Sequence, residues 1–301
     1  MNVLVGKTFG IGNFVCSIPM IKALCSVGNV TVLTGKTPDD IGAIDVHIRL
    51  KNDLNFTDGG GADVSWLCDE KRRYDVAVMA IPYDGRWKEG VHFLADKVVD
   101  CRPRPEFSKE LGFSSWKKHE VEYQMENAYE LGYIGKIPDC SFMKPVEKIK
   151  RRVYVGMGYK RDTSGFWNQK HWGNENFVEL IKKILSSYDD ATVVTSGNMV
   201  DAVTAMWPIM RKVNDLNRFT VRQTSLFSSF DIINSCDVYV GNDTGMMHVA
   251  ASTGCKTIGI FKLDNSWTKS SPWCEHAIAI KGYNRNVDVD EVFEHVKEFM
   301  K

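Results

Sequence analysis

The sequence predicts an α/β protein with two domains, each built on a parallel β-sheet. Along the 301 residues, short β-branched runs alternate with stretches of helical period, separated by Gly, Asn or Asp. This alternation indicates parallel strands joined by right-handed crossovers. The rhythm stops over residues 138–152, which hold two prolines and a charged run, and restarts at residue 153. We therefore expect two Rossmann-like domains facing a cleft, residues 1–145 and 146–301, with the last helix able to pack back on the first domain.

Each element is assigned from its local pattern, because β-branched runs mark strands and apolar residues three or four apart mark helices. In the first domain we expect strands at 2–6, 30–33, 43–50 and 74–81, helices at 14–27 and 118–132, and loop-rich stretches at 51–70 and 83–118. In the second domain we expect strands at 153–156, 191–195, 237–241 and 256–261, and helices at 175–187, 200–213, 225–235, 244–253 and 288–300.

The overall composition excludes several classes of protein. Hydrophobic residues make up 44% and charged residues 25%, which excludes a disordered or low-complexity chain. Lys and Arg total 38, as do Asp and Glu, so the zero net charge argues against a protein that coats nucleic acid through bulk charge. No run approaches the ~18 apolar residues of a membrane span, and the N-terminus lacks a signal-peptide pattern. We expect a cytoplasmic protein whose scattered cysteines are reduced.

The strongest motif covers residues 240–251, where a buried strand ends at Gly241 and a helix starts three or four residues later. Backbone N–H groups over Thr244–Met246, together with the helix dipole, would form an anion site suited to a diphosphate. An ordinary helix cap at Asp243, with His248 packed one turn on, explains one residue of the motif but not the whole string.

A second motif begins with Gly156 and Gly158, which follow the strand that opens the second domain. A polar, basic loop over residues 159–164 then leads to Lys170, just before a helix. A lysine and an arginine above a strand end could neutralise a phosphate leaving group. Taken alone, such a loop is more often exposed surface, so this motif supports the first one and does not stand by itself.

Glycines also follow the first strand, at Gly10 and Gly12. A dinucleotide fingerprint would need glycine at position 15, where Val15 stands, so we do not expect NAD binding. Asp288 and Asp290 precede a charged helix, where helix capping is a better interpretation than Mg²⁺ binding. We expect neither a metal nor a bound cofactor.

In their order and rough spacing, these segments resemble the heptosyltransferase family of bacterial glycosyltransferases, family 9, which has the GT-B fold. Residues 3–24 resemble the family's opening strand, loop and helix, and Lys-His-Trp at 170–172 resembles its Lys-x-Trp element. Residues 242–251 resemble its Asp-Ser/Thr-Gly-x-x-His-x-x-Ala signature. Residues 50–140 match no motif, and in this family that region helps to form the acceptor side.

The resemblance implies an inverting, metal-independent transfer of a sugar from a nucleotide-diphospho-sugar to an acceptor hydroxyl. It implies a catalytic set of Asn13, Lys170 and Asp243, with Lys170 stabilising the diphosphate, and it places Gly10 and Gly12 on the acceptor side. From the motifs and the resemblance together, the predicted donor-binding residues are Gly158, Lys160, Arg161, Thr163, Ser164, Gly197, Asp201, Thr244, Gly245, Met246 and His248.

One position departs from the family pattern. Where the family usually has Asp, the candidate general base, this chain has Asn13, and an amide cannot accept the acceptor's proton at neutral pH. Asn13 could orient the acceptor while another residue acts as base. Alternatively, the acceptor needs little base assistance, or the protein binds a sugar nucleotide without turning it over. We favour the first interpretation, because the donor motif is intact; candidate bases in the N-terminal loops are Asp58, Asp84, Glu89 and His92.

The acceptor stays open at this point. The family implies a lipopolysaccharide core sugar, and a hydroxymethylated DNA base is an alternative, because GT-B enzymes of phage origin glycosylate such bases. Three basic clusters, at 71–73, at Arg102 and Arg104 with Lys117 and Lys118, and at 148–152, could contact phosphates, with Trp87 and Trp116 as stacking candidates. Each cluster alone is more often exposed surface charge. A sugar-nucleotide epimerase of the same fold is the least favoured alternative. The sequence does not indicate an oligomeric state.

Overall fold

A computed structural model of the chain describes residues 1–6, 10–34, 47–50, 74–79, 94–100, 118–158, 170–262, 266–282 and 285–301. The chain divides into two compact units, one of residues 1–107 and 118–142 and one of residues 143–301 with 108–117. The sequence-based boundary, after residue 145, lies close to this division. Among the described residues, no helix has both the length and the apolar character needed to cross a bilayer.

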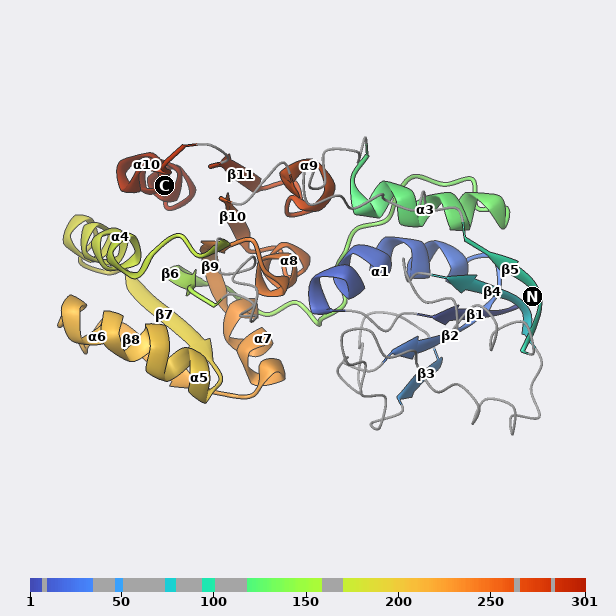
Figure 1. The fold of residues 1–301 in the computed structure, drawn as a ribbon, viewed down its shortest axis with the longest axis horizontal. Coiled ribbons are helices and arrows are strands. Elements are labelled where there is room, and N and C mark those ends of the chain that lie inside the picture. Colours follow the sequence, from blue (N-terminus) through green and yellow to red (C-terminus); the bar gives the residue numbers. More distant parts are fainter. Residues whose placement is uncertain are drawn as a thin grey trace. The chain divides into compact units, whose positions relative to one another are not determined.

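The first unit contains a five-stranded sheet of parallel strands in the order β3-β2-β1-β4-β5. Its strands are β1 (Asn2–Gly6), β2 (Asn29–Thr34), β3 (His47–Leu50), β4 (Tyr74–Met79) and β5 (Ala95–Val99). Two helices, α1 (Ile11–Cys25) and α3 (Glu120–Glu130), pack side by side in this unit (Figure 1). Val3, Leu4 and Val5 of β1 are all buried, as expected for a central parallel strand covered on both faces.

Helix α1 begins at Ile11, three residues earlier than the sequence predicts. Its N-cap is Gly10, whose φ of 44° lies in the left-handed region that favours glycine. Asn13 therefore lies in the first turn of the helix and not in the preceding loop. Pro19 lies inside α1, and the helix continues past it to Cys25.

The second unit contains a six-stranded parallel sheet in the order β11-β10-β9-β6-β7-β8. Its strands are β6 (Ile149–Gly156), β7 (Thr192–Gly197), β8 (Phe219–Gln223), β9 (Cys236–Asn242), β10 (Lys256–Phe261) and β11 (Ala277–Lys281). Its helices are α4 (Asn174–Ser187), α5 (Met199–Asp201), the π-helix η3 (Ala202–Met206), α6 (Trp207–Val213), α7 (Leu226–Asn234), α8 (Gly245–Ser252), α9 (Ser266–Ser270) and α10 (Val289–Phe299).

Helices cover both faces of this second sheet. On one face, Val153 and Val155 of β6 join a buried cluster with side chains of α4, α6 and α10. On the other face, the rings of Tyr154 and Tyr239 stack at 5.5 Å, on the side that carries α7 and α8. The closing helix α10 buries its apolar side in this unit, with α4, β9 and β10.

The strand order reverses in the middle of each sheet. In the second sheet, β6, β7 and β8 extend to one side, and β9, β10 and β11 extend to the other. In the first sheet, the reversal lies between β1 and β4. Open α/β sheets bind ligands outside the carboxyl ends of their strands at such a reversal. The topology therefore directs attention to the ends of β6 and β9 and to the end of β1.

Several elements differ from the sequence-based expectation. The stretch 83–118 was expected to be loops but includes β5, and the expected linker 138–152 includes the first half of β6. The start of β6 does not show a strand pattern because it holds charged residues and a bulge. At this bulge Arg151 has a φ of 54° and donates to Asp190 at 2.8 Å. The helix expected at 200–213 is interrupted by η3, and β8, α9 and β11 were not predicted.

Candidate functional site

The start of α8 lies at the reversal point of the second sheet, directly after β9. Thr244 occupies the N-cap position, but within the described helix its side chain makes no capping hydrogen bond, and the first turn holds no acidic residue. An α-helix cannot satisfy its own first N–H groups. The amides of Gly245 and Met246, with the positive end of the helix dipole, therefore form a candidate anion site.

Lys170 and Asp243 form an ion pair beside this helix start. Their side chains are only 13% and 7% exposed, so water and salt screen the pair weakly. The structure thus brings together two of the three predicted catalytic residues, which lie 73 positions apart in the sequence.

Asn242 holds three segments of the site in register. Its side-chain oxygen accepts from the Trp172 amide at 3.0 Å, and its side-chain nitrogen donates to the carbonyls of Met157 at 3.1 Å and Gly158 at 3.2 Å. Trp172 is itself buried and donates through Nε1 to the Val287 carbonyl at 3.0 Å. Asn242 is a positioning residue that the sequence analysis missed, and its signal was a buried amide at the end of a central strand.

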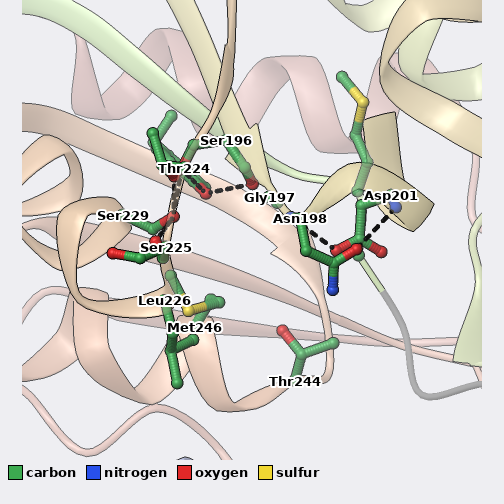
Figure 2. Close-up of a pocket in the computed structure, with 14 residues that line it drawn as sticks. Ser196, Gly197, Asn198, Asp201, Thr224, Ser225, Leu226, Ser229, Thr244 and Met246 are labelled. Carbon is green, nitrogen blue, oxygen red and sulfur yellow. Dashed lines mark hydrogen bonds between the residues drawn. The ribbon is translucent and has the colours of Figure 1, made fainter. Parts of the chain in front are cut away.

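A pocket of about 130 Å³ adjoins the start of α8 (Figure 2). Its walls come from the carboxyl ends of β6 and β7, the segment after β8, and the starts of α7 and α8. The lining residues are Tyr154, Gly156, Met157, Gly158, Ser196, Gly197, Asn198, Asp201, Thr224, Ser225, Leu226, Ser229, Thr244 and Met246. Most of them were not predicted as site residues, because they come from several separate strand ends and helix starts that only the fold brings together.

One wall of the pocket is a chain of hydroxyl groups. The Tyr154 hydroxyl lies 2.9 Å from Ser196 Oγ, which donates to Ser229 Oγ at 2.8 Å, and Thr224 Oγ1 lies 2.8 Å from the same Ser229 oxygen. Burial raises the pKa of Tyr154 to about 12, so its hydroxyl stays protonated at neutral pH. This wall therefore offers neutral hydrogen-bonding groups and no charge.

Asp201 brings a carboxylate to the pocket wall (Figure 2). Its backbone N–H donates to the Asn198 side-chain oxygen at 3.1 Å, and its carboxylate accepts from the backbone N–H of Asn198 at 3.4 Å. A side chain on Gly197 would place Cβ only 2.9 Å from Asp201 Cβ, so glycine is required there. Among the described lining residues, Asp201 is the acidic one.

The structure brings most of the predicted donor residues to one place. Gly158, Gly197, Asp201, Thr244 and Met246 line the pocket. Gly245 and the buried His248 lie in α8. Lys160, Arg161, Thr163 and Ser164 lie outside the described residues, as do the candidate bases Asp58, Asp84, Glu89 and His92.

The predicted acceptor-side residues lie in the first unit. Gly10, Gly12 and Asn13 form the start of α1, at the carboxyl end of the central strand β1. The roles assigned to them stay predictions. In the described part of the chain, no group of three or more His, Cys, Asp or Glu side chains gathers in a way that could hold a metal ion.

Sequence comparison places the chain close to one family. Residues 112–295 match the profile of glycosyltransferase family 9 (heptosyltransferase). The lipooligosaccharide heptosyltransferase 2 of Campylobacter jejuni is 24% identical over 110 residues, which are 36% of this chain and 34% of that protein. The match therefore spans about a third of the length of this relative.

Structural comparison covers the whole chain. A structure of the E. coli heptosyltransferase WaaC with ADP has a TM-score of 0.73 and 16% identity, over 99% of this chain and 100% of that one. The E. coli ADP-heptose lps heptosyltransferase II has a TM-score of 0.72 and 16% identity, over 100% and 98%. At such low identity these matches show the fold alone, and they confirm the predicted GT-B fold.

Proposed function

This chain belongs to glycosyltransferase family 9, and we propose that it transfers a sugar from a nucleotide-diphospho-sugar to an acceptor hydroxyl. The start of α8 carries the proposal, because it joins a helix end suited to an anion, a partly buried lysine and a hydroxyl-lined pocket at one sheet edge. A diphosphate fits the helix end and a nucleoside fits the pocket. Together they make up the donor without its sugar.

The proposed donor lies across the strand ends of the second unit. Its diphosphate accepts hydrogen bonds from the amides of Gly245 and Met246, and the helix dipole stabilises its negative charge. The nucleoside enters the pocket, where Asp201 and the nearby hydroxyls of Thr224 and Ser225 suit the hydroxyl groups of a ribose. An ADP-sugar is the first candidate, because the similar E. coli enzyme was solved with ADP.

We propose an inverting displacement. The acceptor oxygen forms a bond to the anomeric carbon from the face opposite the diphosphate, while the bond from that carbon to the β-phosphate oxygen breaks. The leaving diphosphate keeps the electron pair, and Lys170 with the α8 amides stabilises the charge that develops on it. Because these groups supply the positive charge, we propose that the reaction needs no divalent metal. The acceptor's proton passes to a general base.

Asn13 is not that base, because an amide does not accept a proton at neutral pH. We propose that Asn13 orients the acceptor hydroxyl from the first turn of α1 and that a carboxylate or histidine takes the proton. The candidates remain those of the N-terminal loops.

For the acceptor we propose a lipopolysaccharide core sugar. The relatives named above support it, since one carries the name of a lipooligosaccharide enzyme and another that of an lps heptosyltransferase. No comparison reported above names a nucleic acid, so the hydroxymethylated DNA base remains the less supported alternative. A gel shift on modified duplex DNA at two salt concentrations would distinguish them, because phosphate contacts give a salt-dependent affinity.

Isothermal titration calorimetry across ADP-, UDP- and GDP-sugars tests the proposal. We expect the folded protein to bind at least one of them, and to hydrolyse or transfer its sugar in the presence of EDTA. Binding without any turnover would mean a silent sugar-nucleotide-binding protein. Absence of binding to every nucleotide sugar, in a folded sample, would refute the proposal.

A further inference from the structure

Among the described residues, Lys170, Asp243 and the start of α8 do not by themselves balance the charge of a diphosphate. Lys170 is paired with Asp243, so the two side chains together carry no net charge. A diphosphate brings at least two negative charges to the helix end. The partial charge of about +0.5 at the N-terminus of a helix offsets only part of this. A further cation at the same sheet edge would complete the site.

Lys262 is in the right place to be that cation. It directly follows β10, and β10 pairs with β9 in the register Ile260↔Asn242. The backbone N–H of Asp243 also donates to the carbonyl of Ile260 at 3.2 Å, so the end of β10 is fixed beside the segment that leads into α8.

The Lys262 ammonium group is already directed toward the site. Its Nζ donates to the backbone carbonyl of His171 at 3.3 Å, and His171 is the neighbour of Lys170 in the chain. In the described parts of the chain, Lys262 forms no ion pair with a carboxylate, in contrast to Lys170. Lys262 is half-buried, so its charge is screened less than that of a fully exposed lysine.

The order of the strands says which phosphate Lys262 would contact. The nucleoside pocket lies over β6 and β7, on one side of β9. Lys262 follows β10, on the opposite side of β9. A nucleotide that enters the pocket and crosses the start of α8 therefore presents its more distant phosphate toward Lys262.

Lys281 is the next candidate along the same edge, and it fits less well. It ends β11, one strand farther from α8, and it is exposed. Its Nζ lies 3.6 Å from the centre of the Trp267 ring, so its charge already has a cation–π partner.

Resting on the proposed function, we infer that Lys262 binds the β-phosphate of the donor, the phosphate that leaves with the nucleoside. Lys170 and Lys262 would then hold the leaving group from the β9 and β10 sides of the helix start. The backbone carbonyl of His171 holds the Lys262 ammonium close to this position when no donor is bound.

Calorimetric titrations of ADP and AMP into the full-length wild type and Lys262→Met test this inference. We expect Lys262→Met to weaken ADP binding about tenfold and to change AMP binding less than about twofold, because AMP lacks the β-phosphate. Lys262→Arg should retain most of the ADP affinity. The matched control is Lys256→Met, at the opposite end of the same strand, which should leave both affinities unchanged.

Three results would overturn the inference. ADP binding by Lys262→Met as tight as in the wild type would show that Lys262 does not contact the phosphates. An equal loss of ADP and AMP affinity would show a general effect on the site and no specific contact with the β-phosphate. The variant Lys262→Gln, with its thermal stability measured as well, repeats the test with a polar side chain. A wild type that binds no nucleotide at all would refute the proposed function first, and this inference with it.

Discussion

Two helices of this protein, α1 and α8, start in equivalent topological places but with different chemistry. Each follows a central strand of a parallel sheet, at the point where the strand order reverses. Neither has an acidic residue in its described first turn. Both starts therefore leave a positive dipole end available to a ligand, and the surrounding side chains decide what that ligand is.

The described side chains around the two starts differ in charge. Lys170 and Asp243 meet at α8, and Lys262 follows the neighbouring strand. The first turn of α1 offers the neutral amide of Asn13. Under the proposed function, the second unit holds the anionic donor, whereas the start of α1 lies beside an uncharged hydroxyl group of the acceptor. This division matches a charged donor and a neutral attacking group.

The largest effect is expected from Lys170→Met, which removes a cation from the α8 start. We expect kcat to fall about a hundredfold, because lost stabilisation of charge developing in the transition state costs that much. Steady-state kinetics of sugar transfer measures it. Lys297→Met, which changes an exposed lysine on α10, is the matched control and should leave kcat unchanged.

Lys170→Met also removes the ammonium group that forms an ion pair with the buried carboxylate of Asp243. The double variant Lys170→Met with Asp243→Asn removes the carboxylate charge as well and should restore stability without restoring turnover. If Lys170→Met kept kcat within threefold of the wild type, the difference between the two helix starts would have no catalytic meaning.

A smaller effect concerns the sheet below the α8 start. A Cβ at Gly156 would lie 2.1 Å from the Tyr239 hydroxyl oxygen, so Gly156→Ala forces the stacked tyrosines apart. We expect a loss of about 2 kcal/mol in the free energy of unfolding, which urea denaturation measures. Gly158→Ala is the control, because no described atom lies within 4 Å of its added Cβ. Equal stability of the two variants would contradict the tight packing described here.

The smallest effect is expected at the α1 start, from Asn13→Ala. If Asn13 only orients the acceptor, kcat/KM for the acceptor should fall about tenfold, roughly the worth of one well-placed hydrogen bond. The affinity for ADP should stay the same. Acceptor kinetics and calorimetry on one preparation separate the two quantities. Unchanged turnover by Asn13→Ala would show that this position has no central role.

Local patterns in the sequence predicted the end of β9 and the start of α8, because these two parts are consecutive in the chain. The run from Gly241 to His248 predicts a strand end, a glycine and a helix start within a few residues. Lys170 was found from a resemblance, and only the fold shows that it pairs with Asp243. The hydrogen bonds of Asn242 join three segments that are far apart in the sequence, so no local pattern predicts them.

The elements that the sequence did not predict correctly have identifiable physical causes. β8 is short and carries Arg222 and Gln223, so its composition does not stand out from a loop. Thr224, the member of the hydroxyl wall that directly follows β8, was missed with it. The start of β6 was not predicted because its first residues are charged. Asn13 was predicted to precede α1, but the left-handed Gly10 starts the helix earlier than the apolar pattern suggests.

A crystal structure of the protein with ADP tests the central claim most directly. The account predicts phosphate oxygens within hydrogen-bond distance of the Gly245 and Met246 amides, the ribose beside Asp201, and the β-phosphate near Lys170 and Lys262. A well-ordered ADP whose phosphates lie away from the start of α8 would contradict it.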